Sequence, residues 1–378
     1  MMRSRSLPAL VLLTASWLVA QAPSKEQFDD LAQRAQAALD KKPEEAIELY
    51  KQALAIRPDW PEGWLYMGGT LYQLGRYAEA TDALRKGIGL APVFANGWAL
   101  LGLSESQLDD PDQALADIRK GEELGLHGNP QFEAAVRARA AQLLVLSSAF
   151  DEAMAQLQPL TQYPNSPPLV EELAGLCALG SASDLAQLAP ERRAVVGAAG
   201  KAAWALVAKR PDAAAAYQQL LAQYPTQPGV HYANGLFLME TGDKGALAEF
   251  QKELQTNPKH WPAMLAMATI EIRQGAPEKA MEAVQAATKI APPKLRWLCH
   301  LYLGRANLDL KNNTSAISEL EAAVRQKPSN ASVHLYLSQA YEVAGRKADA
   351  EREKAEYEKA KAQDQAKASV FHPFGMMQ

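Results

Sequence analysis

Cysteine is scarce in this sequence, with only Cys177 and Cys299 among 378 residues. The two are too far apart to form a zinc-ligand pair, and the six histidines include no His-Glu-x-x-His motif. The sequence therefore contains neither of these zinc-binding patterns. We expect neither a metal nor a cofactor.

A complete phosphate-binding loop is also missing. The segment from Gly197 to Lys201 has two residues between its glycines where the loop motif has four, and Ala202 stands where that motif needs Ser or Thr. We interpret the segment as an alanine- and glycine-rich helix start. With no reactive group of residues found elsewhere, we predict a protein without a catalytic role.

No long apolar run is present that would cross a membrane comfortably. An uncharged stretch from Leu7 to Ala20 follows Arg3 and Arg5, and small residues come after it. This pattern is typical of a secretory signal peptide, which we place at residues 1–22. The stretch is shorter than the roughly 20 apolar residues of a spanning helix. The alternative to a signal peptide is that the stretch is not cleaved and serves as a membrane anchor.

A signal peptide predicts an exported protein, periplasmic or associated with the envelope. No cysteine lies near the end of the leader, so we do not expect a lipoprotein. An excess of basic residues is lacking too: without the leader, 37 basic side chains stand against 43 acidic ones, a net charge of −6. This balance argues against a nucleic-acid partner and against direct membrane binding after signal cleavage.

What the sequence does contain is a 34-residue period. Trp64 recurs as Trp98, and the same step relates Gly68 to Gly102. Other pairs keep the register: Ala46, Ala80 and Ala114, and Pro58 with Pro92. A period of this length with conserved spacing of large and small residues predicts a helix–turn–helix repeat.

Each repeat has the pattern of two short amphipathic helices. Trp64, Met67, Gly68 and Leu71 occupy one face of a first helix, and Gly75 marks its end. A second helix follows and ends before a proline, which a helix interior cannot accommodate. One such hairpin cannot bury its apolar face alone. It must therefore stack on further copies, of which at least three are needed.

With this pattern the chain resembles a tetratricopeptide repeat protein of the exported bacterial type, with about nine repeats. The match is most specific over residues 61–128, where two regular units follow each other. The resemblance implies an all-α fold, a right-handed α-solenoid of antiparallel helix hairpins with an irregular bend near 166–196.

We expect the following organisation. The signal peptide is followed by an N-terminal array of about four repeats over 25–165 and an irregular helical connector over 166–196. A C-terminal array of about five repeats with a capping helix covers 197–368, and the tail is 369–378. The break is placed where the regular pattern fades.

The register also explains the histidines and cysteines. Three histidines recur near the position that tryptophan holds in the regular units: His231, His300 and His334. Such recurrence favours a packing role. Cys177 and Cys299 lie about three and a half repeats apart, so we expect two separate buried thiols rather than a disulfide.

In this fold the first helices line a concave groove. Helical phase places there the candidate partner-binding residues Tyr66, Tyr72, Arg139, Tyr232, Arg273, Tyr302, Arg305, Tyr336 and Gln339. Tyrosine and arginine often dominate binding energy at interfaces. As an alternative, these side chains cover neighbouring side-chain stems. The Lys, Arg and Asn set with which some family members clamp a terminal carboxylate is absent from residues 61–128.

We therefore predict a non-catalytic scaffold that binds a protein or peptide in the concave groove. The resemblance to exported repeat proteins implies a role in envelope assembly or secretion. Two alternatives stay open. One is an enzyme or ligand-binding protein with a site in the irregular 166–196 region, and the other is a membrane-tethered assembly factor.

Overall fold

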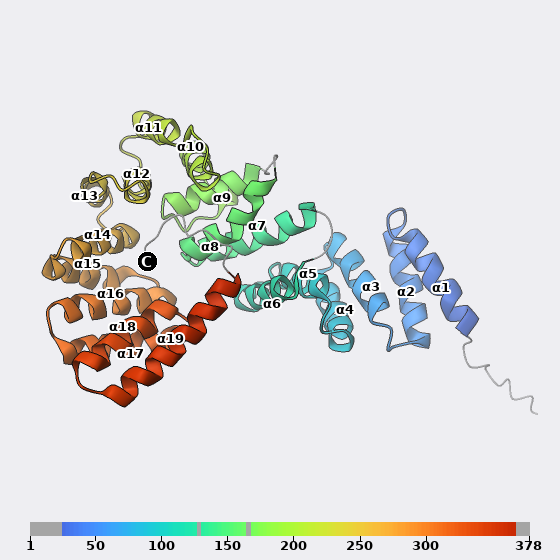
Figure 1. The fold of residues 1–378 in the computed structure, drawn as a ribbon. Helices are drawn as coiled ribbons and strands as arrows, with labels where there is room; N and C mark the ends of the chain where they lie inside the picture. The colour runs from blue at the N-terminus through green and yellow to red at the C-terminus, as the bar shows by residue number, and fades with distance from the viewer. Residues whose placement is uncertain (1–24, 127–129, 164–167, 368–378) are drawn as a thin grey trace, which may run out of the picture. The chain divides into compact units, whose positions relative to one another are not determined.

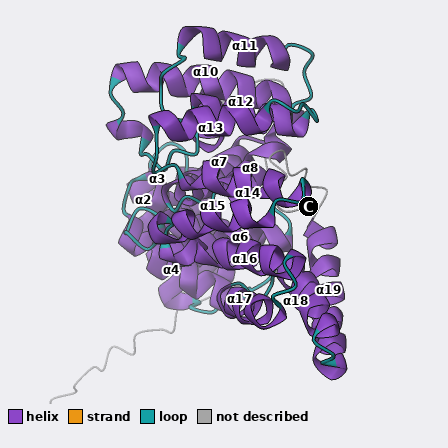
Figure 2. Cartoon of the chain, turned by 90° about the vertical axis from the view of Figure 1, so that its left-hand side faces the viewer, coloured by secondary structure: helices purple, strands orange, loops and turns teal. Residues whose placement is uncertain are grey.

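The computed structural model describes residues 25–126, 130–163 and 168–367. The predicted signal peptide and the predicted tail lie outside the described residues. Throughout the described part, the regular elements are helices and no strand is formed (Figures 1 and 2). None of these helices combines the length and apolar character needed to cross a membrane.

The chain divides into two compact units, which we call the N-terminal unit (1–126) and the C-terminal unit (127–378). The expected boundary near residue 165 thus lies inside the C-terminal unit. The helices of the N-terminal unit are α1 (Lys25–Ala38), α2 (Pro43–Ile56), α3 (Pro61–Gln73), α4 (Tyr77–Leu90), α5 (Ala95–Glu105) and α6 (Pro111–Leu124).

The C-terminal unit is also helical, from green to red in Figure 1. Its first half comprises α7 (Pro130–Leu146), α8 (Phe150–Leu157), η1 (Gln158–Gln162), α9 (Pro168–Ala178), η2 (Leu185–Gln187), α10 (Pro190–Val207), α11 (Ala213–Gln223), α12 (Val230–Glu240) and α13 (Ala246–Thr256). The second half comprises α14 (Trp261–Arg273), α15 (Pro277–Ile290), η3 (Pro293–Leu295), α16 (Arg296–Asp309), α17 (Asn313–Gln326), α18 (Ala331–Val343) and α19 (Lys347–Lys367).

Successive helices pair as antiparallel hairpins, and each hairpin stacks on the next within its unit. This confirms the predicted fold class, an all-α solenoid of helix hairpins. The hairpin turn has a physical signature at Gly75, whose φ is +72°. There the Arg76 N–H donates to the Leu71 carbonyl and the Gly75 N–H to the Tyr72 carbonyl, closing the Schellman motif that favours glycine.

Small residues allow the two helices of a hairpin to approach closely. A Cβ atom on Gly102 would lie 2.6 Å from the Ala114 carbonyl oxygen and 2.9 Å from the Ile118 nitrogen, both of them backbone atoms. On Gly68 it would meet the side chain of Leu84 instead. At Gly102, α5 and α6 are therefore so close that any side chain there would meet the backbone of α6.

The packing of α5 against α6 buries two acidic side chains. Glu105 and Asp117 are 2% and 4% exposed. Burial, together with the neighbouring Asp117 carboxyl, raises the pKa of Glu105 to about 7, although Arg85 opposes this with an ion pair of 2.8 Å. The folded N-terminal unit therefore binds a proton at Glu105 more tightly than the unfolded chain does.

The stability of the N-terminal unit should accordingly fall as the pH rises. Because the folded pKa lies above the ordinary value, the contribution is fully present below about pH 4.5 and is lost as the pH rises to about 7. Between pH 5 and 7.5 the loss should be about 2 kcal/mol. Hydrogen exchange of the α5 and α6 amides would measure it, and Glu105→Gln should remove most of the slope. An unchanged slope in that variant would contradict the assignment.

The expected connector contains ordered helices. α9 packs closely on α10, and α10 pairs in turn with α11. Pro190 opens α10, since proline fits the first helical position. The segment from Gly197 to Lys201 lies in the middle of this helix, so the expected helix start at 197 was wrong, and the boundary at 196/197 falls inside α10.

Candidate functional site

Three predicted groove residues contact a residue of their own unit: Tyr66 and Tyr72 in the N-terminal unit, and Arg139 of α7 in the C-terminal unit. Tyr66 on α3 is 46% exposed, and its ring stacks on Tyr50 at a centroid distance of 6.2 Å. Tyr72 is half-buried against Tyr77. Arg139 is half-buried and donates to the Gln142 amide oxygen at 2.9 Å. Each of these three side chains therefore has a packing partner in the described structure.

Tyr232 and Tyr302 are buried, each with 1% exposure, so their prediction as groove residues was wrong. The Tyr232 ring packs against Phe250 and, edge-on, against His260. The Tyr302 hydroxyl accepts a hydrogen bond of 3.1 Å from Thr269 on α14. Burial raises the pKa of Tyr302 to about 12. The cause is that α14 and α16 contact each other directly and cover the inward-pointing ring.

The other four predicted residues come together in one open pocket of about 210 Å³. Arg273 is contributed by α14, Arg305 by α16, and Tyr336 and Gln339 by α18, the first helices of three successive hairpins (Figure 1). The remaining wall is formed by three residues outside the predicted set: Ile272, Leu308 and Asp309. We call these seven residues the arginine pocket.

Arg305 is the central cation of the arginine pocket. Its guanidinium carbon lies 4.6 Å from the centroid of the Tyr336 ring and 5.9 Å from that of Tyr302. Such contacts of a cation with an aromatic face are favourable and fix the plane of the group. Among the described residues, no hydrogen bond or ion pair engages the guanidinium of Arg305. Its N–H donors are thus held in place without an acceptor in the part of the chain that the structure describes.

The pocket also contains charges of both signs. Arg273 and Arg305 supply two cations, and Asp309 supplies one anion four residues after Arg305 on the same helix. Gln339 is exposed and adds an amide that can both donate and accept. The pocket therefore carries a net positive charge and an excess of hydrogen-bond donors in a chain whose overall charge is −4.

A family model described as tetratricopeptide repeat matches residues 37–103, and another with the same description matches residues 301–366. Both segments consist of the stacked hairpins described above. The chain is a tetratricopeptide repeat protein. Repeats of this family typically form scaffolds, and their presence here indicates a scaffold for protein–protein interaction.

Solved structures with a similar arrangement are distant in sequence. One, entitled "Crystal structure of APC/C hetero-tetramer Cut9-Hcn1", has 15% identity and a TM-score of 0.37 and covers 90% of this chain and 80% of its own. Yeast Tom70 has 13% identity and a TM-score of 0.29 and covers 92% of this chain and 98% of its own. No curated protein matches the sequence.

One position of the tetratricopeptide repeat is occupied by tryptophan in some units and by histidine in others. The Trp64 and Trp98 indole N–H groups donate to the Pro58 and Pro92 carbonyls at 2.9 and 2.8 Å. His334 makes the equivalent contact, with Nε2 2.9 Å from the Pro328 carbonyl oxygen. The histidine at this position therefore replaces an indole as a packing and hydrogen-bonding group.

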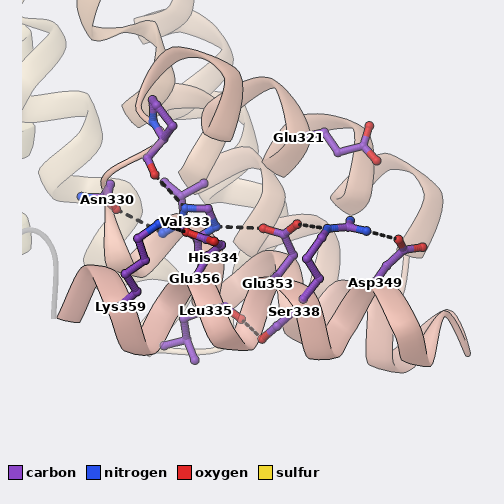
Figure 3. Close-up of polar contacts among 12 residues, drawn as sticks. Glu321, Asn330, Val333, His334, Leu335, Ser338, Asp349, Glu353, Glu356 and Lys359 are labelled. Atoms are coloured by element: carbon purple, nitrogen blue, oxygen red, sulfur yellow. Dashed lines mark hydrogen bonds and ion pairs between the residues drawn. The ribbon is translucent and has the colours of Figure 1, made fainter. Parts of the chain in front are cut away.

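Each of the three recurring histidines also faces a glutamate on the second helix of its hairpin. The Nδ1-to-carboxylate distances are 2.8 Å for His231–Glu249, 2.7 Å for His300–Glu319 and 2.8 Å for His334–Glu353. Figure 3 shows the last of these, where Glu353 lies between His334 and a chain of contacts that ends at Asp349. The structure thus gives these histidines the structural role that their register predicts.

Both cysteines of this repeat protein are buried and unpaired, as predicted. Burial raises the pKa of each thiol, which keeps both protonated at neutral pH. The described residues of the 166–196 region form helix, turn and loop, and Asp184 accepts a hydrogen bond from the Ala186 N–H. In the described residues, no three His, Cys, Asp or Glu side chains are arranged to hold a metal ion.

Proposed function

We propose that this protein is an exported, non-catalytic scaffold that holds an extended segment of a protein partner on the concave face of its C-terminal unit. The observation that carries this proposal is the arginine pocket. It joins three consecutive first helices and presents a fixed guanidinium with no acceptor among the described residues. A repeat array offers such a surface because side chains on the inner face of its first helices do not pack between neighbouring repeats.

Export and a role in envelope assembly or secretion are part of this proposal. They are supported by the leader, in which Arg3 and Arg5 precede the uncharged run from Leu7 to Ala20. The acidic balance of the remaining chain supports a protein partner in preference to nucleic acid or an anionic membrane surface.

The proposal is tested by photo-crosslinking in a native envelope fraction. A crosslinking amino acid in place of the exposed Gln339 should capture a partner, whereas one in place of the exposed Ser318 on the second helix α17 should not. Adding Arg305→Ala should reduce capture at position 339 several-fold. The same preparation should yield a chain that begins near residue 23. Equal capture at both positions would contradict groove binding, and an intact leader would make the protein a membrane-tethered factor.

A further inference from the structure

The arrangement around Arg305 shows which chemistry the arginine pocket can accept. A guanidinium is always charged at physiological pH and presents its donors in a planar fork that matches a carboxylate. The guanidinium carbon lies over the Tyr336 ring, 4.6 Å from its centroid, and this contact restrains the fork. Arg305 is itself half-buried, so its donors are partly removed from water. A partner group that accepts two hydrogen bonds would replace the hydrogen bonds to water that these donors lose on burial.

The other walls restrict this group further. Ile272 and Leu308 are apolar and lie beside the two arginines, so they can contact methylene groups that carry an acid. Gln339 can donate a further hydrogen bond from its amide. Asp309 repels a second negative charge within the same space. The pocket is therefore suited to a single carboxylate on a short aliphatic stem.

We propose that the arginine pocket accepts the side chain of one glutamate or aspartate from an extended segment of the partner. This inference rests on the proposed function and specifies its partner chemistry. The acid docks with its carboxylate on the fork of Arg305 and its stem against Ile272 and Leu308. Neighbouring residues of the segment then follow the row of first helices α14, α16 and α18.

The test begins with a displayed library of random peptides whose C-termini are fused to the carrier, selected on the full-length protein without its leader. Peptides enriched on the wild type should carry an acid at one fixed position. A synthetic, amidated copy of such a peptide should bind about tenfold more tightly than its version with glutamine in place of that acid. In Arg305→Gln this preference should disappear.

Three further variants test the planar fork of Arg305, the hydroxyl of Tyr336 and the charge of Asp309 separately. Arg305→Lys keeps the charge but removes the planar fork, so it should retain only a small part of the preference. Tyr336→Phe keeps the aromatic face and should retain nearly all of it. Asp309→Asn removes a repelling charge and should tighten binding of the acidic peptide. An unchanged thermal unfolding midpoint in each variant shows that the fold is intact.

Other outcomes would overturn the inference in distinguishable ways. Peptides that bind at the groove without any preference for an acid would overturn it and leave the proposed function in place. A requirement for an unblocked peptide C-terminus would overturn it in favour of terminal-carboxylate recognition. Peptide binding that none of the pocket substitutions changes would overturn both the inference and the proposed binding surface.

Discussion

Replacing Gly200 by alanine is expected to lower the unfolding free energy of the C-terminal unit by about 3 kcal/mol or more. Gly200 lies on α10 where that helix crosses α9, and a Cβ atom there would stand 2.1 Å from the Glu171 carbonyl oxygen. The reciprocal contact is as close, since a Cβ on Gly175 would stand 2.1 Å from the Val196 carbonyl oxygen. Because both obstacles are backbone atoms, the helices have to separate to admit a methyl group.

Gly197 provides a matched control three residues earlier on the same helix. A Cβ atom there would meet nothing within 4 Å. Gly197→Ala should therefore be neutral or stabilise the protein by up to about 1 kcal/mol, as alanine is the better helix former. Urea unfolding and hydrogen exchange of the α9 and α10 amides measure both effects. Equal stability of the two variants would show that α9 and α10 do not cross at Gly200.

This pair of glycines also illustrates what the sequence could not reveal. Gly197 and Gly200 belong to a segment that resembles an incomplete phosphate loop, and nothing in the local pattern distinguishes them. Their difference depends on α9, whose contact residue Gly175 is 25 positions away from Gly200 and outside the 34-residue register. Periodicity predicts contacts between copies of a repeat. It does not predict the contacts of a helix such as α9, whose sequence departs from the repeat.

The candidate site was predictable to the extent that helical phase determines it. Helical phase assigns Arg305, Tyr336 and Gln339 to inner positions of regular first helices, and the structure brings the three together in one pocket. Tyr302 shares this phase but is buried, because the direct contact of α14 with α16 closes the surface above it. How closely α14 approaches α16 depends on the curvature of the stack. The residue pattern of a single helix does not determine this curvature.

Asp309 was overlooked for a related reason. It is the last residue of α16, where the chain turns, and the pocket reaches this end of the first helices. An acid at a helix end is usually solvated, so the sequence gives no sign that it shares a pocket with two arginines. The position of three helices relative to each other was needed to identify it.

The second large effect is expected at the His334–Glu353 contact of the terminal hairpin. Both ring nitrogens of His334 face acceptors, with the Pro328 carbonyl at 2.9 Å and the Glu353 carboxylate at 2.8 Å (Figure 3). The imidazolium form can donate to both. His334 and Glu353 are only 4% and 7% exposed. Glu353→Ala therefore leaves the Nδ1 of the buried His334 without the carboxylate that faces it. We expect a loss of about 3 kcal/mol for the α18–α19 hairpin, measured by hydrogen exchange of the α19 amides.

The N-terminal unit supplies a replacement that should reverse this loss. Trp64 occupies the equivalent position and donates to Pro58, and the residue nineteen positions later is the buried Ala83. The double variant His334→Trp with Glu353→Ala reproduces that pair, because an indole N–H can donate to Pro328 without needing an acid opposite it. It should recover most of the protection lost in Glu353→Ala, whereas His334→Ala with Glu353→Ala should recover less because it leaves the Pro328 carbonyl without its donor and opens a cavity. If both double variants behave alike, tryptophan and histidine are not interchangeable at this position and the common role assigned to them is wrong.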